Sequence, residues 1–344
     1  MIKVLIVDDS AVVRKVLTDE LSKVDGIEVV GTATDPYVAR EKIFALKPDV
    51  MTLDVEMPRM DGLTFLGKLM RHHPMPVVVV SSLTPEGSEA ALRALELGAV
   101  DVVPKPGGSF TVADISKQLV SRIRMAAVSR PRKREQSPEP EGVPARPPAL
   151  IRTTHKVLAI GASTGGTQAI RQILECLPVT TPATLIVQHM PEHFTAAFAH
   201  RLNEASAMEV REAAPGDSLA SGVALIAPGN RHLVLRRSGT LYQADVLDGP
   251  PVHYQRPSVD VLFQSVARQA GPNALGVLLT GMGADGAAGL LSMRQAGAHT
   301  IAQDEATSVV YGMPREAVQM GAACEVSPLE EVARRIGEAF EQAG

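Results

Sequence analysis

Short runs of β-branched and other apolar residues alternate with helix-length amphipathic stretches along most of the chain. The first 124 residues contain five such runs: KVLIV, EVVGTA, DVMTLDV, PVVVVSS and AVDVVPK. In the stretch after the first run, Leu17, Leu21 and Val24 recur at steps of four and three, and Asp9 or Ser10 can cap the helix. Apolar strands that alternate with helices are typical of a parallel sheet covered on both faces. This predicts a doubly wound α/β domain.

A proline-rich, charged segment interrupts the alternation near the middle of the chain. Residues 129–148 read SRPRKREQSPEPEGVPARPP, with six prolines and Val143 as the one sizeable apolar residue. Such a segment buries too little apolar surface to offset the entropy lost on ordering. We therefore expect two domains, residues 1–124 and 156–344, joined by a flexible Pro-rich linker over 125–155.

The second half of the chain shows a related pattern. Strand-like runs read KVLAIGAS, ATLIVQH, VALIAPG, ALGVLLTGM and HTIAQD, and helical segments follow most of them. The stretch HLVLRRSGTLYQADVL has hairpin character, with Ser238 and Gly239 at its turn. This predicts a second doubly wound α/β domain whose sheet carries an antiparallel hairpin.

Composition excludes some classes of function. A net charge of −4, with 45% hydrophobic and 21% charged residues, predicts a soluble globular protein that binds no nucleic acid. MIKVLIVDDS leads directly into a strand, and no apolar run reaches 18 residues, so we expect a cytoplasmic protein without membrane insertion. Cys176 and Cys324 match neither a zinc nor a disulfide spacing, and we expect reduced thiols in the core.

Five charged or hydroxyl side chains fall at the carboxyl ends of strands in the first domain. Asp8 and Asp9 follow the first strand, Asp54 ends the third, Ser81 ends the fourth, and Lys105 follows the fifth. Clustered carboxylates repel one another unless a hard cation joins them, so we predict Mg²⁺ held by Asp9 and Asp54. Any one of these acids alone is better explained as a helix cap or a loop residue, but the set predicts a site that accepts a phosphoryl group.

The motifs VDDS, LDVEMPRMDG, VSS and PKP resemble those of the receiver domain of response regulators, over the whole of the first domain. The resemblance implies a flavodoxin-like fold, Asp54 as the phospho-acceptor and a histidine kinase as the phosphodonor. Val102 stands where many receivers carry an aromatic residue. An aromatic rotamer switch is therefore not assumed.

The second domain contains a G-x-S-x-G sequence, GASTG at 161–165, directly after the strand KVLAI. Glycines at 161, 165 and 166 permit a sharp turn, and the helix that follows supplies N–H groups for an oxyanion. Strand, glycine turn and helix also describe a phosphate-binding loop. From this loop alone, a serine nucleophile and a nucleotide site are equally well supported.

A base and an orienting acid are available at other strand ends. His189 closes the strand TLIVQH, and Asp285 lies in LLTGMGADG. In this interpretation Ser163 attacks, His189 accepts its proton and Asp285 fixes the imidazole tautomer. The order Ser, His, Asp differs from the Ser, Asp, His order of α/β-hydrolases, so an ordinary lipase fold is not expected.

The same residues also allow other interpretations. His189 and His193 have the spacing of a zinc-binding helix, but Pro191 lies between them and no glutamate follows His189. Asp285 taken alone is better explained as a helix N-cap. A nucleotide site needs an acid about 20 residues beyond the glycine loop, and the nearest one is Glu175, inside a helical segment. A pure docking domain needs none of the three reactive groups.

The motifs GASTGG, VQHM, PGNRH, RPSVD and TGMGADG, in this order behind a receiver, resemble the chemotaxis protein-glutamate methylesterase (CheB) family over nearly the full chain. The resemblance implies a triad of Ser163, His189 and Asp285, with backbone oxyanion donors around Thr164 and Met282. It implies hydrolysis of γ-glutamyl methyl esters, and deamidation of glutamines, on methyl-accepting chemoreceptors, without a cofactor for hydrolysis. It also implies that the unphosphorylated receiver covers the approach to Ser163.

Overall fold

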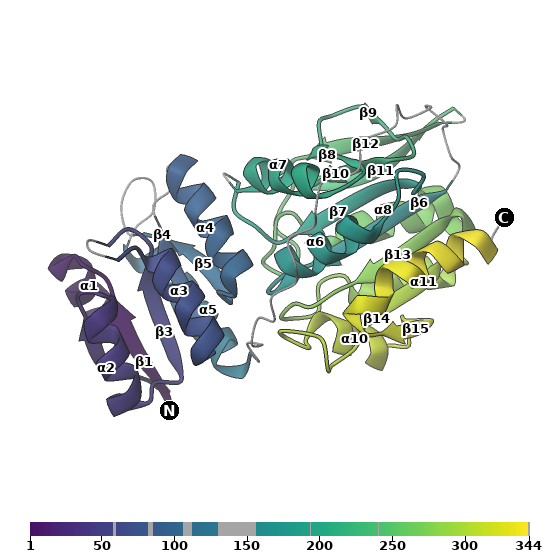
Figure 1. Cartoon of the computed structure of the whole chain (residues 1–344). Helices are drawn as coiled ribbons and strands as arrows, with labels where there is room; N and C mark the ends of the chain where they lie inside the picture. The colour runs from purple at the N-terminus through teal and green to yellow at the C-terminus, as the bar shows by residue number, and fades with distance from the viewer. Residues whose placement is uncertain are drawn as a thin grey trace. The chain divides into compact units, whose positions relative to one another are not determined.

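The computed structural model describes residues 1–57, 60–81, 85–105, 112–129, 156–192, 194–239 and 241–342 (Figure 1). The chain divides into two compact units, residues 1–137 and 138–344. Helix α5 (Val112–Val128) runs four residues past the expected end of the first domain, and Met125 and Ala126 are buried. Residues 125–128, together with the buried Ser129, whose N–H donates to Ala126 O, therefore belong to the first domain. The rest of the predicted linker, residues 130–155, lies outside the described residues.

The first unit is built on a five-stranded parallel sheet with strand order β2-β1-β3-β4-β5. The strand order reverses direction between β1 and β3, so the loops after these two strands diverge over opposite faces of the sheet. The predicted doubly wound fold is confirmed for this unit. The remaining elements are β1 (Ile2–Val7), α1 (Ala11–Leu21), β2 (Ile27–Ala33), α2 (Pro36–Leu46), β3 (Val50–Asp54), α3 (Gly62–His72), β4 (Val77–Ser81), α4 (Pro85–Leu97) and β5 (Asp101–Pro104).

Helices cover both faces of this sheet. Leu5 and Val7 of β1 pack with side chains from α2, α3 and α4, whereas Val4 and Ile6 pack with α1 and α5. The strands are apolar on both faces because each face meets a helical layer. Ser10 caps α1, and its Oγ accepts a hydrogen bond from Val13 N at 3.4 Å, as the sequence predicted.

The second unit contains a seven-stranded parallel sheet with order β15-β14-β13-β6-β7-β10-β8. Helix α8 packs on α9, and α6 packs on α7 and α11. Strand β6 lies between β13 and β7, so the loops that follow these three strands meet at one edge. The bounds are β6 (Val157–Ala162), α6 (Gly166–Cys176), β7 (Ala183–Gln188), α7 (Thr195–Ala205), β8 (Glu209–Glu212), β10 (Val223–Ile226), α8 (Val259–Ala270), η1 (Gly271–Asn273), β13 (Ala274–Leu278), α9 (Ala287–Gln295), β14 (His299–Gln303), α10 (Met313–Gln319), β15 (Glu325–Ser327) and α11 (Leu329–Gln342).

The predicted hairpin forms a sheet of its own and does not extend the parallel sheet. Strands β11 (His232–Ser238) and β12 (Leu241–Leu247) are antiparallel, and β9 (Asp217–Ser218) pairs with β12. Ser238 pairs with Leu241, so Ser238 belongs to β11 and the turn begins at Gly239. The hairpin buries its apolar face together with α8, and Leu235 N donates to Ser265 Oγ at 2.8 Å.

Both cysteines are free, but both are exposed, so the prediction of core thiols was wrong. Cys176 ends α6, and Cys324 precedes the edge strand β15, at positions where apolar burial is incomplete. Within the described residues, no helix has the length and apolar character needed to cross a membrane.

Candidate functional site

The five predicted residues of the first unit lie at one edge of its sheet. Ligand atoms of Asp8, Asp9 and Asp54 all lie within 4.8 Å of one another. Lys105 Nζ is 2.7 Å from Asp54 Oδ2, and Lys105 N donates to the carbonyl of Ser81 at 2.8 Å. The carboxyl ends of adjacent parallel strands thus bring an acidic cluster and one cation together.

Burial governs the charge of this cluster. Asp8 and Asp54 are 2% and 1% exposed. Burial raises the pKa of Asp8 to about 6, although the Ser10 N–H bonds to it. Burial also raises the pKa of Asp54, against the opposing effect of the hydrogen bond from Lys105. Asp8 Oδ2 has no hydrogen-bond partner within the described part of the chain. A buried oxygen without a donor, beside two further carboxylates, fits a Mg²⁺ site.

Backbone contacts fix Ser163 at the carboxyl end of β6. Ser163 N donates to Thr280 O at 3.0 Å, and the Ser163 carbonyl accepts from Gln188 Nε2 and Gly166 N, each at 2.8 Å. The strand register that pairs Ala162 with Gln188 places His189 beside Ser163 at the neighbouring strand end. The backbones of both residues are therefore anchored by the sheet itself.

His189 and Asp285 form a buried pair. His189 Nε2 lies 2.7 Å from Asp285 Oδ2, and both side chains are 2% exposed. Because a carboxylate only accepts hydrogen bonds, Nε2 carries the proton in this pair. His189 Nδ1 is buried and has no hydrogen-bond partner among the described residues. One imidazole nitrogen is thus oriented by the acid and the other is available as a base.

The carboxylate of Asp285 lies at the N-terminus of α8. Ser258 Oγ donates to Oδ1 at 2.7 Å, Val259 N donates to Oδ2 at 2.8 Å, and Asp260 N donates to Oδ1 at 3.0 Å. Burial alone would raise the pKa of Asp285, but the His189 pair and these donors hold that pKa below its ordinary value. The N-cap of the following helix, α9, is Gly286, so the interpretation of Asp285 as the cap of its own helix is wrong.

Sequence reasoning missed several residues that support this arrangement. Ser258 lies in the RPSVD motif and caps α8, which a serine before a helix predicts, but nothing in the sequence links it to an acid 27 residues away. Gln188 holds the Ser163 carbonyl, and Thr280 Oγ1 donates to the Thr164 carbonyl at 2.9 Å. These contacts depend on strand neighbours that are far apart in the sequence.

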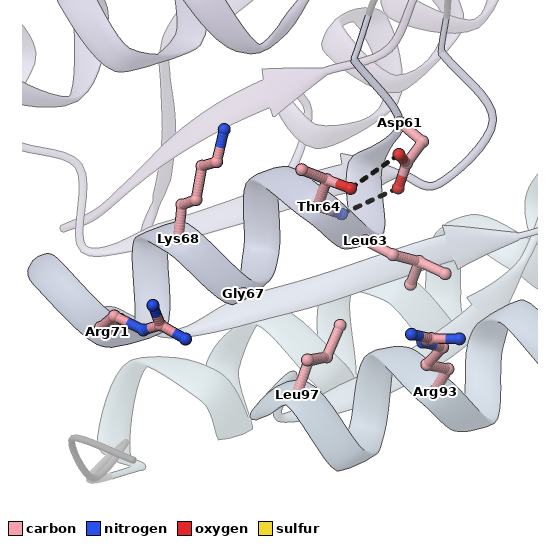
Figure 2. A pocket seen from close by; sticks show the side chains of 8 residues that line it. All are labelled: Asp61, Leu63, Thr64, Gly67, Lys68, Arg71, Arg93 and Leu97. Atoms are coloured by element: carbon pink, nitrogen blue, oxygen red, sulfur yellow. Dashed lines mark hydrogen bonds between the residues drawn. The ribbon is translucent and has the colours of Figure 1, made fainter. Parts of the chain in front are cut away.

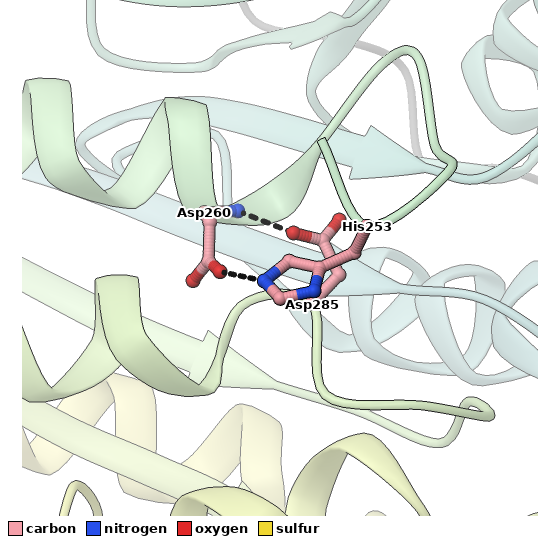
Figure 3. Close-up of side chains that lie close together, drawn as sticks. All are labelled: His253, Asp260 and Asp285. Atoms are coloured by element: carbon pink, nitrogen blue, oxygen red, sulfur yellow. Dashed lines mark hydrogen bonds and ion pairs between the residues drawn. The ribbon is translucent and has the colours of Figure 1, made fainter. Parts of the chain in front are cut away.

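A second acid and a histidine adjoin Asp285 (Figure 3). His253 Nε2 is 3.1 Å from Asp260 Oδ2, and the ligand atoms of His253, Asp260 and Asp285 lie within 4.8 Å of one another. Asp260 is 2% exposed, and burial raises its pKa. His253 has a φ of 50°, in the left-handed region. Asp260 N also donates to Asp285, so the two carboxylates are held side by side.

Close backbone packing surrounds Ser163. A Cβ atom added to Gly281 would lie 2.7 Å from Ser163 Cβ and would overlap Met313 Sδ. Thr164 is 4% exposed, and Met282, which follows Gly281, is 48% exposed. The oxyanion role of the Thr164 and Met282 backbone stays a prediction.

The structure also bears on the zinc site and the nucleotide site that the sequence allows. His189 follows the end of β7 and lies before α7, so it is not on a zinc-binding helix. His193 lies outside the described residues. Glu175 is within α6 and pairs with Arg171 at 2.7 Å, away from the strand ends where a nucleotide site needs an acid.

Comparisons with known proteins cover both units. Residues 158–336 match the CheB methylesterase family, and residues 4–115 match the response regulator receiver domain. A protein-glutamate methylesterase/protein-glutamine glutaminase of Syntrophus aciditrophicus (strain SB) is 58% identical over 336 residues, 97% of this chain and 98% of the relative. One of Pectobacterium atrosepticum is 56% identical over 337 residues, 97% and 96% of the two chains. The crystal structure of the Thermotoga maritima CheB methylesterase catalytic domain matches with a TM-score of 0.52 and 34% identity, covering 53% of this chain and 97% of that chain.

Proposed function

This chain belongs to the CheB methylesterase family, and we propose that it hydrolyses γ-glutamyl methyl esters on methyl-accepting chemoreceptors, with Ser163 as the nucleophile. The observation that carries the proposal is the 2.7 Å pair of His189 and Asp285, with His189 at the strand end next to that of Ser163. Glutamine side chains are proposed as second substrates. A methyl ester and an amide of the same side-chain carboxyl group lead to the same γ-glutamyl acyl-enzyme, so one triad serves both.

The chemistry follows from the proton positions. Ser163 Oγ attacks the γ-carbonyl while His189 Nδ1 accepts the hydroxyl proton. Asp285 stabilises the imidazolium through the Nε2–H that it already accepts. The imidazolium then protonates the leaving methoxide oxygen or amide nitrogen, so that methanol or ammonia departs and the acyl-enzyme remains. Water, deprotonated by His189 in turn, hydrolyses the acyl-enzyme and restores Ser163.

The developing oxyanion is assigned to the backbone N–H groups of Thr164 and Met282. The close approach of Gly281 to Ser163 supports this assignment, because it brings the following peptide to the nucleophile. Donors fixed in advance at such a position lower the barrier without reorganisation during the reaction. Ester hydrolysis by this route uses no cofactor.

The first unit is proposed to control the second by phosphorylation of Asp54, with a histidine kinase of the chemotaxis system as the donor. Asp9 and Asp54 would hold Mg²⁺, which neutralises charge on the transferred phosphoryl oxygens. Lys105, already 2.7 Å from Asp54, and Ser81 are assigned to the phosphoryl oxygens. The unphosphorylated receiver is proposed to restrict access to Ser163, so that phosphorylation gives sensory adaptation in the cytoplasm.

The decisive experiment measures methanol release from methylated receptor membranes. Ser163→Ala should lower turnover by about 10⁶, because the residues of a triad act as a unit. Fluorophosphonate labelling of the wild-type protein, absent from the variant, would locate the reactive hydroxyl at Ser163. Release at a near wild-type rate by a folded Ser163→Ala protein would refute the assignment.

A further inference from the structure

A groove of about 520 Å³ lies between α3 and α4 of the first unit, separate from the acidic cluster (Figure 2). Gly67 of α3 and Leu97 of α4 lie in its middle in Figure 2, and Leu63 lies nearer one end. Figure 2 shows Arg71 toward one end of the groove and Arg93 toward the other. The groove therefore combines an apolar middle with a guanidinium at each end.

The cations of this groove have no internal partners. Lys68, Arg71 and Arg93 are exposed, and none of them forms an ion pair or hydrogen bond within the described part of the chain. The one carboxylate that lines the groove, Asp61, accepts hydrogen bonds from Thr64 N and Thr64 Oγ1, both at 2.8 Å. Three unpaired positive charges against one carboxylate held by its own helix leave the groove electropositive.

Gly67 lies inside α3 at a position where packing within the unit does not explain a glycine. Glycine inside a helix costs about 0.5–1 kcal/mol relative to alanine. A Cβ atom at Gly67 would meet only Leu97 Cδ2, at an ordinary 3.6 Å, so packing within the unit does not require glycine there. A glycine that the fold itself does not need leaves the middle of the groove open at the backbone.

We propose that this groove binds an acidic peptide segment of a partner protein, with an apolar side chain over Gly67 and Leu97 and carboxylates on either side of it. Guanidinium groups bind carboxylates through paired hydrogen bonds, which suits Arg71 and Arg93. The apolar middle distinguishes such a segment from a free anion, which gains nothing from Leu63 and Leu97. The proposal concerns a surface of the first unit and does not depend on the proposed hydrolysis.

Equilibrium titration of the full chain with a dye-labelled peptide, acetyl-Glu-Glu-Leu-Glu-Glu amide, tests the proposal. The wild-type protein should bind the same peptide with glutamine in place of glutamate at least about tenfold more weakly. The Arg71→Glu and Arg93→Glu proteins should show a similar loss of affinity for the acidic peptide. Gly67→Leu should weaken binding similarly by filling the middle of the groove. Arg40→Glu, an exposed charge reversal on α2, should bind like wild type.

Three outcomes would overturn the proposal. Equal affinity for the two peptides would show that the charge of the peptide does not contribute to binding. Unchanged binding by the Arg71→Glu and Arg93→Glu proteins would show that the peptide does not bind in this groove. Displacement of the peptide by inorganic phosphate at the peptide's own concentration would show a simple anion site. Circular dichroism of each variant checks that folding is retained, and Gly67→Ala, which favours the helix, provides a second variant that narrows the groove.

Discussion

Each of the two units buries a carboxylate beyond the carboxyl ends of its parallel strands, and the pKa values of these two carboxylates are shifted in opposite directions. Asp8 is 2% exposed, has one oxygen without a donor, and has a pKa raised to about 6. Asp285 is also 2% exposed, yet its pKa lies below the ordinary value, because His189 and the first turn of α8 donate to it.

The difference shows that burial alone does not set the charge of an acid. Desolvation raises the pKa of both groups, and hydrogen-bond donors together with neighbouring charges decide whether that effect is reversed. In the first unit Asp8 keeps a buried oxygen without a donor beside two further carboxylates, which favours the binding of a cation. The second edge keeps a permanent negative charge from its own donors, which suits an acid that must stabilise an imidazolium.

The strongest test of this contrast is Asp285→Asn. An amide cannot stabilise the imidazolium by charge, and its NH₂ group would face backbone donors, so turnover should fall by about 10⁴. Methanol release and thermal unfolding should be measured together with Asp260→Asn as the matched control. Asp260 is equally buried but pairs with His253 and not with His189, so most activity should remain. Equal losses in both variants would assign the effect to packing rather than to the acid.

In the absence of Mg²⁺, Asp8→Asn is expected to stabilise the folded protein, because it removes a buried carboxylate that lacks a donor. The folded pKa of Asp8, about 6, lies above that of the unfolded chain, so the folded state favours the protonated acid. Stability from this group is therefore highest below about pH 4 and is lost as pH rises through about 6. At pH 7 the variant should be more stable by up to about 3 kcal/mol.

Urea unfolding followed by circular dichroism, in Mg²⁺-free buffer at pH 4 and pH 7, measures this effect. The difference between wild type and Asp8→Asn should vanish at the lower pH, and Mg²⁺ should stabilise the wild type more than the variant. A variant less stable than wild type at pH 7 would mean that the Asp8 carboxylate is already satisfied, as Asp285 is.

Asp54→Ala tests whether the first edge takes up charge from outside. A phosphodonor with Mg²⁺ should activate the wild-type chain, by up to about 100-fold if phosphorylation converts 1% accessible to 99% accessible molecules. The variant should keep its basal methanol release and lose this activation. Asp19→Ala, an exposed acid of α1, should respond like wild type. Activation of the Asp54→Ala protein would move the acceptor to another residue.

The smallest expected effect is that of Ser258→Ala. This change removes one of the donors to Asp285 while His189 and the α8 backbone remain, so turnover should fall by about tenfold. Stability should fall by about 1 kcal/mol because Ser258 also caps α8. Ser258→Thr should restore both if the hydroxyl is what matters. If Ser258→Ala lost stability but kept full turnover, Ser258 would act only as the N-cap of α8.

Local patterns predicted the features that depend on local chemistry. The fully apolar strand of residues 157–162 predicted a buried parallel strand, and the strand ends located Ser163 and His189. The two-residue strand β9 carries no periodicity, so nothing in the sequence predicted that the hairpin would form a separate sheet with it. Likewise, the contacts of Asp285 with Ser258 and Asp260 come from residues more than 20 positions away, and only the folded arrangement of α8 reveals them.

The packing of Gly161 against Val259 constrains the order in which this sequence can change. A Cβ atom at Gly161 would overlap Val259 Cγ1 and would lie 3.1 Å from Val259 Cβ. Every amino-acid substitution open to a glycine codon by a single base change adds at least that atom. A smaller residue at 259 must therefore come first; alanine there would keep the backbone N–H that Asp285 accepts. Along a mutational path, a smaller residue at position 259 permits a change at 161. The reverse order passes through a protein in which β6 and α8 no longer fit together.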